Sequence, residues 1–494
     1  MNRVVVDNRV RVHGRIAAAV RERLEAEFSH ANPKRAALEG MGYSARGEPA
    51  VIRTWRDEDE SLTFPRGGLA RVREALRSAG VEYRVEDRRQ PGVVSGGGIP
   101  DLLQQPWPFQ DEAARAMLAR ENCLLRAPTG GGKTSVLISL IARLKVPSLV
   151  VVWNAGLFDQ WRERLVKELG IDAGDVGVIS GGKWRLKPVT VAMQQSLAAR
   201  ELQPELLEYF GLVGCDEVQR AASDTLYAVV DQFPARYRFG ISADERRKDG
   251  KEFITRDLFG EVAYEVDREE LVRQGFILDV EVRVVPTEFG APWYGHPAEG
   301  LELDDDRLLR EMTADAPRNA MLAGLALSEV QRGEQVLVMS RRVEHCKALC
   351  RELVSRGARC GFLLGGAENK LEYRRSVAGL RDGTIQVGVG TYQALGTGID
   401  IPRVGAGVCA TPIASNRQFF NQVRGRLCRI SPGKASPRLY YAWDHRVVSG
   451  HLDNLRKWNS TVVALVNGAL VKVDSRRAVR GVCAALQGVA GGIG

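Results

Sequence analysis

The chain has 494 residues, of which 44% are hydrophobic and 27% are charged, the balance of a soluble globular protein. This length is too great for one hydrophobic core and predicts roughly three domains. No apolar run reaches the roughly 18 residues that a membrane-spanning helix needs. The charged start MNRVVVDNRVRVHGR also lacks the apolar segment of a signal peptide. Composition therefore argues against a membrane protein, and we expect a cytoplasmic one.

The net charge of +9 is concentrated near the C-terminus. From Val423 to Gly494 the sequence holds 12 lysines and arginines against 3 aspartates, a surplus that equals the charge of the whole chain. Such a basic region is typical of a surface that binds phosphate backbones. A solvated helical tail would have the same composition, so charge alone leaves both interpretations open.

The eight cysteines form no CxxC pair, which predicts reduced thiols in an intracellular protein. The best grouping of metal-ligand residue types is His345, Cys346 and Cys350, with Cys360 further on. The surrounding segment VEHCKALCREL has its apolar residues at helical spacing. We interpret these residues as part of a buried helix face rather than as zinc ligands, because zinc sites usually pair their cysteines.

Residues 1–90 read as a small N-terminal α+β domain. VVVDNRVRV alternates valine with polar residues around Asp7-Asn8, which predicts a β-hairpin. A helix is expected at about residues 15–28, then the strand-like segments AVIRTW and SLTFP, and then a helix in LARVREALRSAG. Residues 91–101 are rich in glycine and proline and read as a linker.

Residues 102–277 and 278–448 each alternate short apolar runs with helical segments, the pattern of a parallel α/β sheet. The expected strands are LKVPSLVVVW, KPVTVAM, FGLVGCDE and YRFGISA in the first half, and EQVLVMS, ARCGFLLG, TIQVGVG and GAGVCAT in the second. The halves are similar in size, as tandem copies of one fold would be. Residues 449–494 read as a basic C-terminal extension, either a nucleic-acid arm or a helical brace. The predicted fold class is therefore α/β, with two tandem parallel-sheet lobes.

The strongest motif is APTGGGKT, which follows the apolar run of NCLLR and precedes the helix SVLISLIARL. A strand, a Gly-rich turn and a helix start in this order make a phosphate-binding loop. Lys133 supplies positive charge, and the hydroxyl of Thr134 can bind Mg²⁺. The glycines let backbone N–H groups surround the phosphates. The residues predicted to hold the nucleotide here are Thr129, Gly130, Gly131, Gly132, Lys133 and Thr134.

A pair of acids completes this predicted site. FGLVGCDEVQ ends a hydrophobic strand in Asp216 and Glu217. Asp216 is the expected partner of Mg²⁺, and Glu217 is placed to orient or deprotonate the attacking water. Two acids at a strand end are common by chance, but together with the upstream loop they indicate catalysis.

The order APTGGGKT, DEVQ, GISAD, GTGID and QVRGRLCR resembles the motif series of superfamily 2 helicases and translocases, and more closely their XPB-like and phage UvsW-like branch. The resemblance covers most of residues 105–430. It implies that the two lobes are RecA-like and that they act on ATP with Mg²⁺. The segment LTFPRGGLARVREALRSAGVEYRVEDRR also resembles the small domain before the motor in this branch, which is thought to engage duplex DNA, although a domain that only buttresses the motor fits too.

The resemblance assigns roles to residues of the first lobe. Gln110, in PFQDEA, stands where the family reads the adenine edge, although a helix-capping glutamine would fit the same place. Gln160, in VVVWNAGLFDQW, and Thr190, at the start of TVAMQQSL, fall in segments that the family places along nucleic acid. We interpret Trp161 as a core residue rather than a base-stacking one. Ser242 belongs to the segment that links hydrolysis to lobe movement.

Further roles follow for the second lobe. VGVGTYQALGTGIDIP resembles motif V, in which Thr391 would face nucleic acid, and Gly398 and Asp400 would face the nucleotide. QVRGRLCR matches the family pattern QxxGRxxR, in which Gln422 would take part in coupling. Arg426 and Arg429 would then be arginine fingers, which stabilise charge on the transferring phosphoryl group.

Two positions depart from the family pattern. Gln219 replaces the last residue of the DEAD or DEAH box, and a glutamine can still form hydrogen bonds between lobes. Asp244 replaces the threonine of the usual SAT sequence. Because that segment is tied to coupling, strand separation is less secure than ATP hydrolysis, and translocation or reannealing stays open.

The resemblance implies an ATP-dependent DNA helicase or translocase that acts on duplex or branched DNA in repair, recombination or replication, in the cytoplasm of a bacterium or phage-infected cell. DNA would be the partner, with possible repair or recombination proteins and no membrane. An RNA helicase and the translocating subunit of a restriction or defence complex are the alternatives. A catalytically silent binding module is disfavoured, because Lys133, Glu217, Arg426 and Arg429 are all present.

Overall fold

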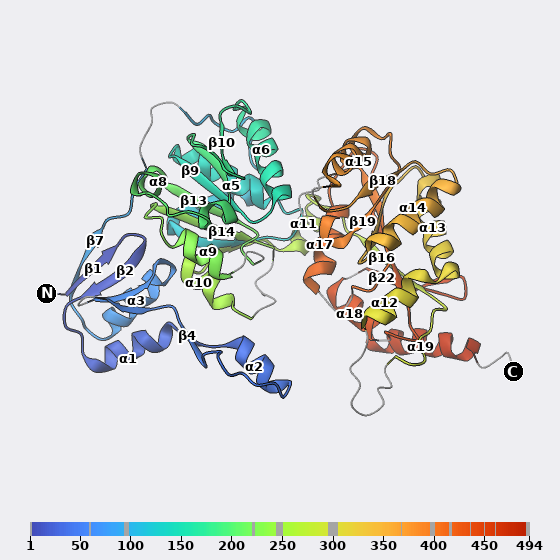
Figure 1. The fold of residues 1–494 in the computed structure, drawn as a ribbon, viewed down its shortest axis with the longest axis horizontal. Helices are drawn as coiled ribbons and strands as arrows, with labels where there is room; N and C mark the ends of the chain where they lie inside the picture. Colours follow the sequence, from blue (N-terminus) through green and yellow to red (C-terminus); the bar gives the residue numbers. More distant parts are fainter. Residues whose placement is uncertain are drawn as a thin grey trace. The chain divides into compact units, whose positions relative to one another are not determined.

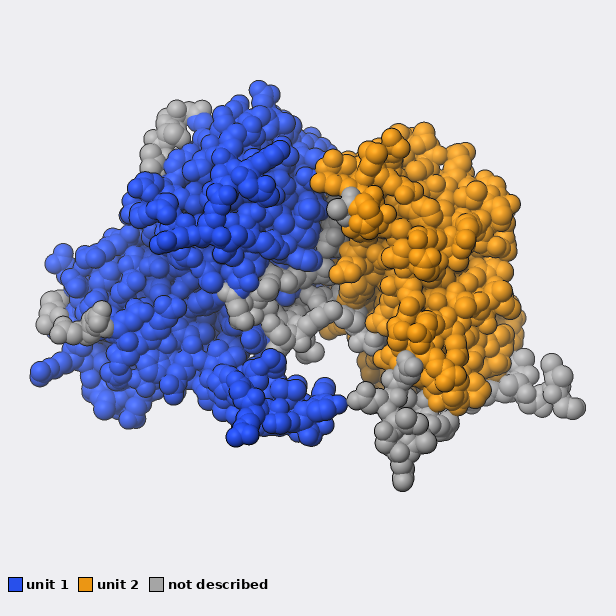
Figure 2. Space-filling view, in the orientation of Figure 1, with its two compact units in different colours: residues 1–268 blue, residues 269–494 orange. Residues whose placement is uncertain are grey.

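A computed structural model describes residues 2–58, 61–92, 98–219, 223–243, 250–294, 305–366, 368–395, 401–413, 417–434, 436–448, 450–459 and 461–490. The chain divides into two compact units, Met1–Arg268 and Glu269–Gly494 (Figure 2). The first unit contains the N-terminal domain and one α/β lobe, and the second contains the other lobe. Within the described residues, no helix combines the length and apolar character that crossing a membrane requires.

The N-terminal domain is built on a five-stranded sheet of order β5-β6-β2-β1-β7. The predicted hairpin is present, since Val6 of β1 pairs with Val10 of β2 across Asp7-Asn8. The alternating valines of both strands are buried in one core with Leu24 and Leu76 of the two helices that pack there. The elements of this domain are β1 (Asn2–Val6), β2 (Arg9–His13), α1 (Ala18–Glu27), β3 (Ser29–Ala31), α2 (Pro33–Gly40), β4 (Val51–Arg53), β5 (Arg56–Glu58), β6 (Ser61–Pro65), the 3₁₀ turn η1 (Arg66–Gly68), α3 (Leu69–Ser78) and β7 (Tyr83–Asp87).

The first α/β lobe has an eight-stranded sheet of order β11-β10-β12-β9-β13-β14-β8-β15. All neighbours are parallel except β10 and β11. Its central strands β9 and β13 are buried along their whole length because helices cover both faces of the sheet (Figure 1). The elements are α4 (Pro108–Arg120), β8 (Asn122–Arg126), α5 (Lys133–Leu144), β9 (Ser148–Val152), α6 (Ala155–Leu169), β10 (Val176–Ser180), β11 (Lys183–Arg185), β12 (Val189–Met193), α7 (Gln194–Ala198), α8 (Pro204–Tyr209), β13 (Leu212–Asp216), α9 (Ser223–Val230), β14 (Tyr237–Ser242), α10 (Glu252–Phe259), β15 (Val262–Glu265) and α11 (Arg268–Arg273).

The second lobe repeats this architecture, with a sheet of order β18-β19-β17-β20-β21-β16-β22-β23. The predicted strands of this half are β17 to β20. Its elements are β16 (Glu281–Pro286), α12 (Asp305–Ala314), α13 (Ala316–Gln331), β17 (Gln335–Ser340), α14 (Val343–Ser355), β18 (Cys360–Leu363), α15 (Lys370–Asp382), β19 (Val387–Thr391), α16 (Tyr392–Leu395), β20 (Val404–Cys409), α17 (Arg417–Leu427), β21 (Arg438–Trp443), α18 (His451–Trp458), β22 (Val462–Val466), β23 (Ala469–Lys472) and α19 (Arg476–Ala490).

The basic C-terminal extension contains sheet as well as helix, which the sequence pattern did not indicate. Strand β22 lies parallel to β16, with Val282 opposite Val462, and β23 then pairs antiparallel with β22. Residues 462–472 therefore complete the sheet of the second lobe, and α18 and α19 flank these strands in sequence. The extension is thus part of the folded lobe over much of its length.

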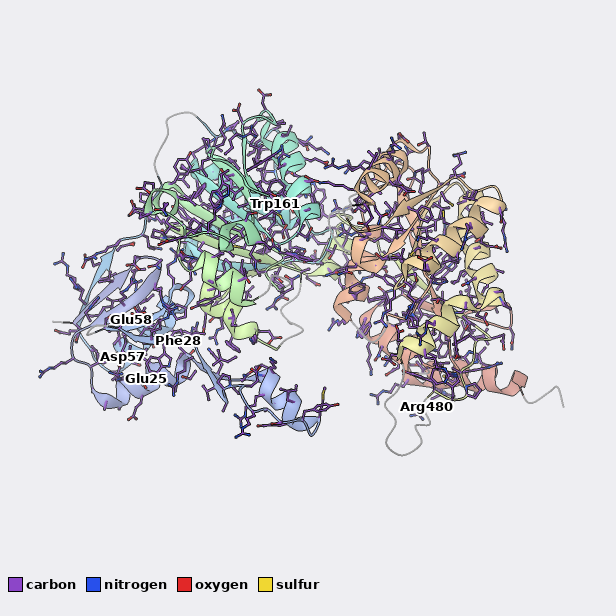
Figure 3. All side chains as sticks on the ribbon, viewed as in Figure 1. Glu25, Phe28, Asp57, Glu58, Trp161 and Arg480 are labelled. Carbon is purple, nitrogen blue, oxygen red and sulfur yellow. The ribbon has the colours of Figure 1, made fainter. Side chains whose placement is uncertain are left out.

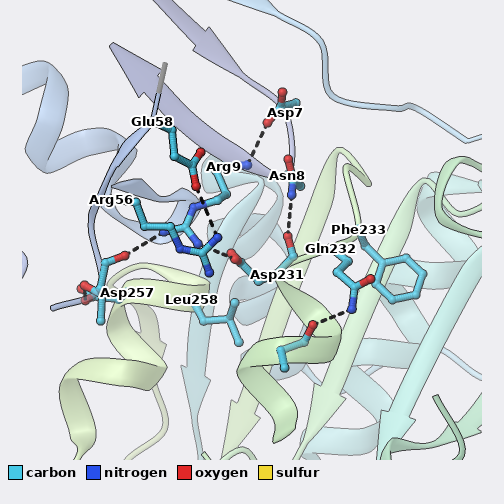
Figure 4. Close-up of polar contacts among 12 residues, drawn as sticks. Asp7, Asn8, Arg9, Arg56, Glu58, Asp231, Gln232, Phe233, Asp257 and Leu258 are labelled. Carbon is cyan, nitrogen blue, oxygen red and sulfur yellow. Dashed lines mark hydrogen bonds and ion pairs between the residues drawn. The ribbon is translucent and has the colours of Figure 1, made fainter. Parts of the chain in front are cut away.

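Polar contacts fix the N-terminal domain to the first lobe at the hairpin turn (Figure 4). The guanidinium of Arg9, 3% exposed, lies 2.7 Å from the Asp231 carboxylate and also donates to the Thr54 carbonyl. Beside it, the Asn8 amide donates to the main-chain carbonyl of Asp231. Burying a charge is costly unless the charge is paired. These contacts therefore specify one arrangement of the sheet of the N-terminal domain and the sheet of the first lobe.

A second buried carboxylate ties the same domain to α10. Asp257 accepts hydrogen bonds from Arg71 and Thr54, both at 2.6 Å, and lies 3.1 Å from the His30 ring nitrogen Nε2. Burial acts to raise the pKa of Asp257, but the hydrogen bonds from His30 and Thr54 and the charge of Arg71 hold it below its usual value. All three partners come from the N-terminal domain, so that domain is a fixed part of the first unit.

Candidate ATP-binding site

The phosphate-binding loop joins β8 to α5 as the sequence predicts. Gly132 has φ +71°, a left-handed conformation that starts α5 and that residues with a side chain rarely adopt. A Cβ atom on Gly131 would lie 2.9 Å from the Pro128 carbonyl oxygen, so the turn is also too tight for a side chain there. The Lys133 ammonium donates to the Ala127 carbonyl at 3.1 Å. Thr134 follows as the second residue of α5. The loop therefore presents backbone donors at a helix N-terminus, which fits phosphate groups.

Gln110 lies against this loop. Its Nε2 atom is 2.2 Å from the place that a Cβ on Gly132 would occupy, and its side chain is 6% exposed. Its Oε1 also accepts a hydrogen bond from the Trp107 backbone N–H, which caps α4. The capping role and the position beside the loop thus occur together in one residue, although the sequence presented them as alternatives.

The two predicted acids follow β13 on the same lobe. Asp216 is 6% exposed, and its Oδ2 accepts a 2.8 Å hydrogen bond from the indole N–H of Trp161. Among the described residues, its Oδ1 has no hydrogen-bond partner. Glu217 has φ +52°, uncommon for a residue with a side chain. Its carboxylate lies 3.6 Å from the Lys133 ammonium.

The electrostatics of Asp216 suit a cation site. Burial and the neighbouring charge of Glu217 raise the pKa of Asp216 to about 6, while Lys133 and the Trp161 hydrogen bond act in the opposite direction. A buried carboxylate with one free oxygen is stabilised in its charged form when a cation binds beside it. Asp216 therefore fits the predicted Mg²⁺, and Lys133 fits the phosphates, while the hydroxyl of Thr134 stays a predicted Mg²⁺ ligand.

A chain of hydrogen bonds runs from Glu217 to the end of β14. The Gln219 amide donates to Glu217 Oε2 at 2.6 Å, and its carbonyl oxygen accepts from Ser242 Oγ at 2.6 Å. Gln219 and Ser242 are 6% and 8% exposed. Gln219 and Ser242, two of the four residues predicted to take part in coupling, are thus joined to Glu217, the predicted catalytic acid. Asp244, another of the four, lies outside the described residues.

The residues predicted to contact nucleic acid differ in accessibility. Gln160 is half-buried on α6, and Thr391 is half-buried at the end of β19, where its hydroxyl accepts from the Ala394 N–H. Thr190 is fully buried within β12, and its hydroxyl donates to the Lys187 carbonyl. This burial contradicts a direct contact through Thr190, because its one hydroxyl is enclosed and locally satisfied. Gln195, just after the same strand, is exposed instead.

In the second lobe, the arginines on α17 and just after it differ in how deeply they are buried. Arg424 is 8% exposed and donates to the Trp458 carbonyl and to Asn459 Oδ1. Arg426, near the end of α17, and Arg429, just after it, are half-buried. Gln422 is buried, and its Oε1 has no partner among the described residues. Gly398 and Asp400, predicted to face the nucleotide, lie outside the residues that the structure describes.

The histidine and cysteines of α14 belong to the core of this lobe. His345 is 2% exposed, and its ring nitrogens are 2.9 Å from Ser340 Oγ and 2.8 Å from Asn319 Oδ1. Burial and the charge of Arg318 lower the pKa of His345 to about 3. Cys346 and Cys350 are buried in the same core. The contacts of His345 are therefore those of a core histidine, in agreement with a buried helix face.

The contact of this site that sequence reasoning missed is the hydrogen bond from Trp161 to Asp216. Figure 3 labels Trp161 within the first lobe. Trp161 was interpreted as a core residue, and it is indeed fully buried. A tryptophan on the apolar face of a helix gives no sign of what its N–H contacts. The only signal was its place in the segment that resembles a nucleic-acid motif.

Two protein-family models match the chain, one on each lobe. The model described as "Type III restriction enzyme, res subunit" matches residues 104–245, and the "Helicase conserved C-terminal domain" matches residues 318–431. The first span contains the phosphate-binding loop and both acids, and the second contains Arg426 and Arg429. The families therefore match where the sequence motifs lie.

Curated relatives agree with these models. A DNA 3'-5' translocase XPB2 of Sulfurisphaera tokodaii is 36% identical over 33% of this chain and 36% of its own length. A DNA 3'-5' helicase XPB of Kineococcus radiotolerans is 25% identical over 69% of this chain and 60% of its own length. The chain thus spans about a third and three fifths of these two relatives.

A solved structure shows the same fold. The fragment of a putative HsdR subunit of a type I restriction enzyme from Vibrio vulnificus is 17% identical, with a TM-score of 0.53, over 75% of this chain and 71% of that one. At this identity the likeness concerns the fold alone. It confirms the predicted tandem RecA-like lobes. Together with the family models and the XPB relatives, these motifs support a helicase of superfamily 2, in its XPB-like and UvsW-like branch.

Proposed function

We propose that this protein is an ATP-dependent DNA helicase or translocase that acts on duplex or branched DNA in repair, recombination or replication. The observation that carries the proposal is the cluster of Lys133, Asp216 and Glu217 at one end of the first RecA-like sheet. The names of the XPB relatives support DNA as the substrate and a 3'-5' direction of movement.

In this proposal ATP binds to the phosphate-binding loop and Gln110 contacts its adenine. Mg²⁺, held by Thr134 and Asp216, would neutralise charge on the phosphates. Glu217 orients or deprotonates the attacking water, and the hydrogen bond from Gln219 fixes its carboxylate for that task. Ser242 links this acid to the end of β14 and hence to the coupling segment.

The second lobe supplies Arg426 and Arg429, which we propose as arginine fingers, and Gln422 as a coupling residue. Since these side chains belong to the other compact unit, hydrolysis would depend on closure of the two lobes. Nucleic acid bound along both lobes, through Gln160 and Thr391, would then favour closure and raise the rate. Gly398 and Asp400 would contact the nucleotide in the same closed state.

The N-terminal domain and the C-terminal extension would add nucleic-acid contacts. Because Arg9 and Asp257 fix the N-terminal domain to the first lobe, DNA bound by that domain would move with this lobe. Contacts to DNA would be mainly to phosphates and thus largely independent of sequence. Repair or recombination proteins remain proposed partners.

Steady-state ATP hydrolysis tests the proposal. The rate is measured without nucleic acid and with single-stranded DNA, duplex DNA, forked DNA and RNA, beside the Glu217→Gln variant. We expect DNA to raise the rate severalfold and the variant to lose hydrolysis by a factor of about 10²–10⁴. Stronger activation by RNA than by every DNA would support the RNA helicase alternative.

A second candidate, the translocating subunit of a restriction or defence complex, is kept as an outcome of this test. The family model on the first lobe takes its description from a restriction subunit. This candidate predicts hydrolysis that ignores every nucleic acid in the isolated chain but is still abolished by Glu217→Gln. That outcome would mean that a partner protein gates the motor.

A further inference from the structure

We infer that Trp161 is a positioning residue that holds the Asp216 carboxylate in place for Mg²⁺, an inference that rests on the proposed ATPase function. The two residues are 55 positions apart in the chain and come from different elements, α6 and the end of β13. Within the part of the chain that the structure describes, they are joined by the 2.8 Å hydrogen bond from the indole N–H to Oδ2.

The two oxygens of the Asp216 carboxylate differ in their contacts. Oδ2 is occupied by Trp161, while Oδ1 has no hydrogen-bond partner among the described residues. An indole N–H can donate but cannot accept, so this bond has one direction and favours a charged carboxylate. The rotamer of Asp216 is thereby fixed, with Oδ1 left available to the cation side of the site.

Trp161 itself is held firmly. Its side chain is fully buried, and Leu157 and Leu165, one helical turn away on either side, are buried as well. The N-cap of this helix is Asn154, whose side chain accepts a hydrogen bond from the Leu157 N–H. A rigid donor can orient an acidic group, whereas a mobile one would follow it.

The same helix carries Gln160, which lies in the segment that resembles a nucleic-acid contact. Gln160 is half-buried and directly precedes Trp161. A displacement of α6 would therefore move the donor of Asp216 together with the proposed nucleic-acid contact.

Partners that orient metal ligands from outside the coordination sphere typically change metal affinity by about 10-fold to 100-fold when removed.

The test compares Trp161→Phe with Trp443→Phe in the full chain. Trp443 is also fully buried, and its indole N–H donates to a main-chain carbonyl, that of Val448, at 3.0 Å. Both changes remove one buried hydrogen bond, but only the first removes it from the carboxylate. Isothermal titration calorimetry gives the affinity for ADP with saturating Mg²⁺ and with EDTA, so the readout needs neither turnover nor nucleic acid.

We expect Trp161→Phe to reduce the Mg²⁺-dependent gain in ADP affinity by about 10-fold or more and to leave the affinity in EDTA unchanged. Trp443→Phe should keep the full gain. The inference is overturned if Trp161→Phe also keeps the full gain, if both variants lose it equally, or if the wild-type chain shows no gain from Mg²⁺.

A second replacement covers the case in which Trp161→Phe does not fold. Benzothienylalanine at position 161 keeps the shape of the indole but has sulfur in place of the N–H. It should show the same loss of Mg²⁺ dependence with near-normal thermal stability, and a full Mg²⁺ gain in this protein would equally overturn the inference. If nucleic acid fails to stimulate hydrolysis while either replacement loses the Mg²⁺ gain, the proposed motor function fails and the role of Trp161 stands.

Discussion

The hydroxyl of Ser242 donates a 2.6 Å hydrogen bond to the side-chain carbonyl of Gln219, and both residues are buried. Ser242 ends β14, while Gln219 follows the acids at the end of the neighbouring strand β13. Because the Gln219 amide also donates to Glu217, a glutamine here serves as acceptor and donor at once. Glutamine at the last position of this motif is therefore compatible with a link between hydrolysis and the coupling segment.

Replacing Gln219 by leucine should interrupt this link. Gln219→Leu keeps a similar volume but removes both the acceptor of Ser242 and the donor to Glu217. We expect a loss of stability of about 1–3 kcal/mol and a lower nucleic-acid-stimulated kcat, because Glu217 loses its orienting bond. Thermal melting and steady-state hydrolysis measure these effects. Gln232→Leu is the control, since the amide of this exposed residue donates to the Ala228 carbonyl and not to an acid of the site. Equal effects of the two variants would contradict the link.

Substitution of Gly132 by alanine should disable nucleotide binding for two separable reasons. The new Cβ would meet the Gln110 amide at 2.2 Å, and the φ of +71° is strained for alanine by about 1–2 kcal/mol. Adding Gln110→Ala removes the collision but not the strain. We therefore expect Gly132→Ala to lose ADP binding and the double variant to recover part of it. No recovery would leave either the backbone strain or the loss of the proposed adenine contact of Gln110 as the cause, and ADP binding by Gln110→Ala alone separates the two.

The strands and the phosphate-binding loop could be predicted because their signals are local. SLVVV is buried along its whole length as β9, and GGGKT lies at the start of α5. A continuous apolar run or a glycine at a helix start carries the same physical meaning wherever it lies. The pairing of β22 with β16 has no such signal, because its partners Val282 and Val462 are far apart in the sequence.

The side-chain contacts of the site were harder to predict for a related reason. Thr190 was assigned to nucleic acid from a motif resemblance, but its place inside β12 encloses the hydroxyl. Arg9 lies in an alternating strand, where an arginine is expected to face solvent. It is buried instead, paired with Asp231 of the first lobe. The burial of both side chains depends on which element packs against them, and a sequence pattern does not contain that information.

The arginines on α17 and just after it should divide into two classes. Arg426→Ala or Arg429→Ala should lower kcat by about 10³-fold or more with little loss of ATP affinity, as for an arginine finger. Arg424→Ala should instead destabilise the second lobe, because it leaves the Trp458 carbonyl and Asn459 without their buried donor. Steady-state kinetics and thermal melting separate the two outcomes. A large loss of stability in Arg426→Ala, with kcat retained, would refute its role in hydrolysis.

The buried carboxylate of Asp257 should make docking of the N-terminal domain depend on pH. Its folded-state pKa is lowered, mainly by its hydrogen bonds and Arg71 acting against burial. Its contribution is therefore present above the unfolded pKa of about 4 and is lost as the pH falls toward the lower folded value. Asp257→Asn should cost about 2–3 kcal/mol at neutral pH, and its melting temperature should approach that of the wild type as the pH falls below 4.

The matched control for this change is Asp453→Asn. Asp453 pairs with Arg456 and Lys457 along the surface of α18, where such pairs contribute about 0–1 kcal/mol. Differential scanning fluorimetry at pH 7 and at several lower values compares the two variants with the wild type. A pH-independent deficit in Asp257→Asn would assign its effect to lost packing rather than to charge. The buried contacts of Asp257 with Arg71 and His30 would then stabilise docking of the N-terminal domain without a contribution from the charge of the carboxylate.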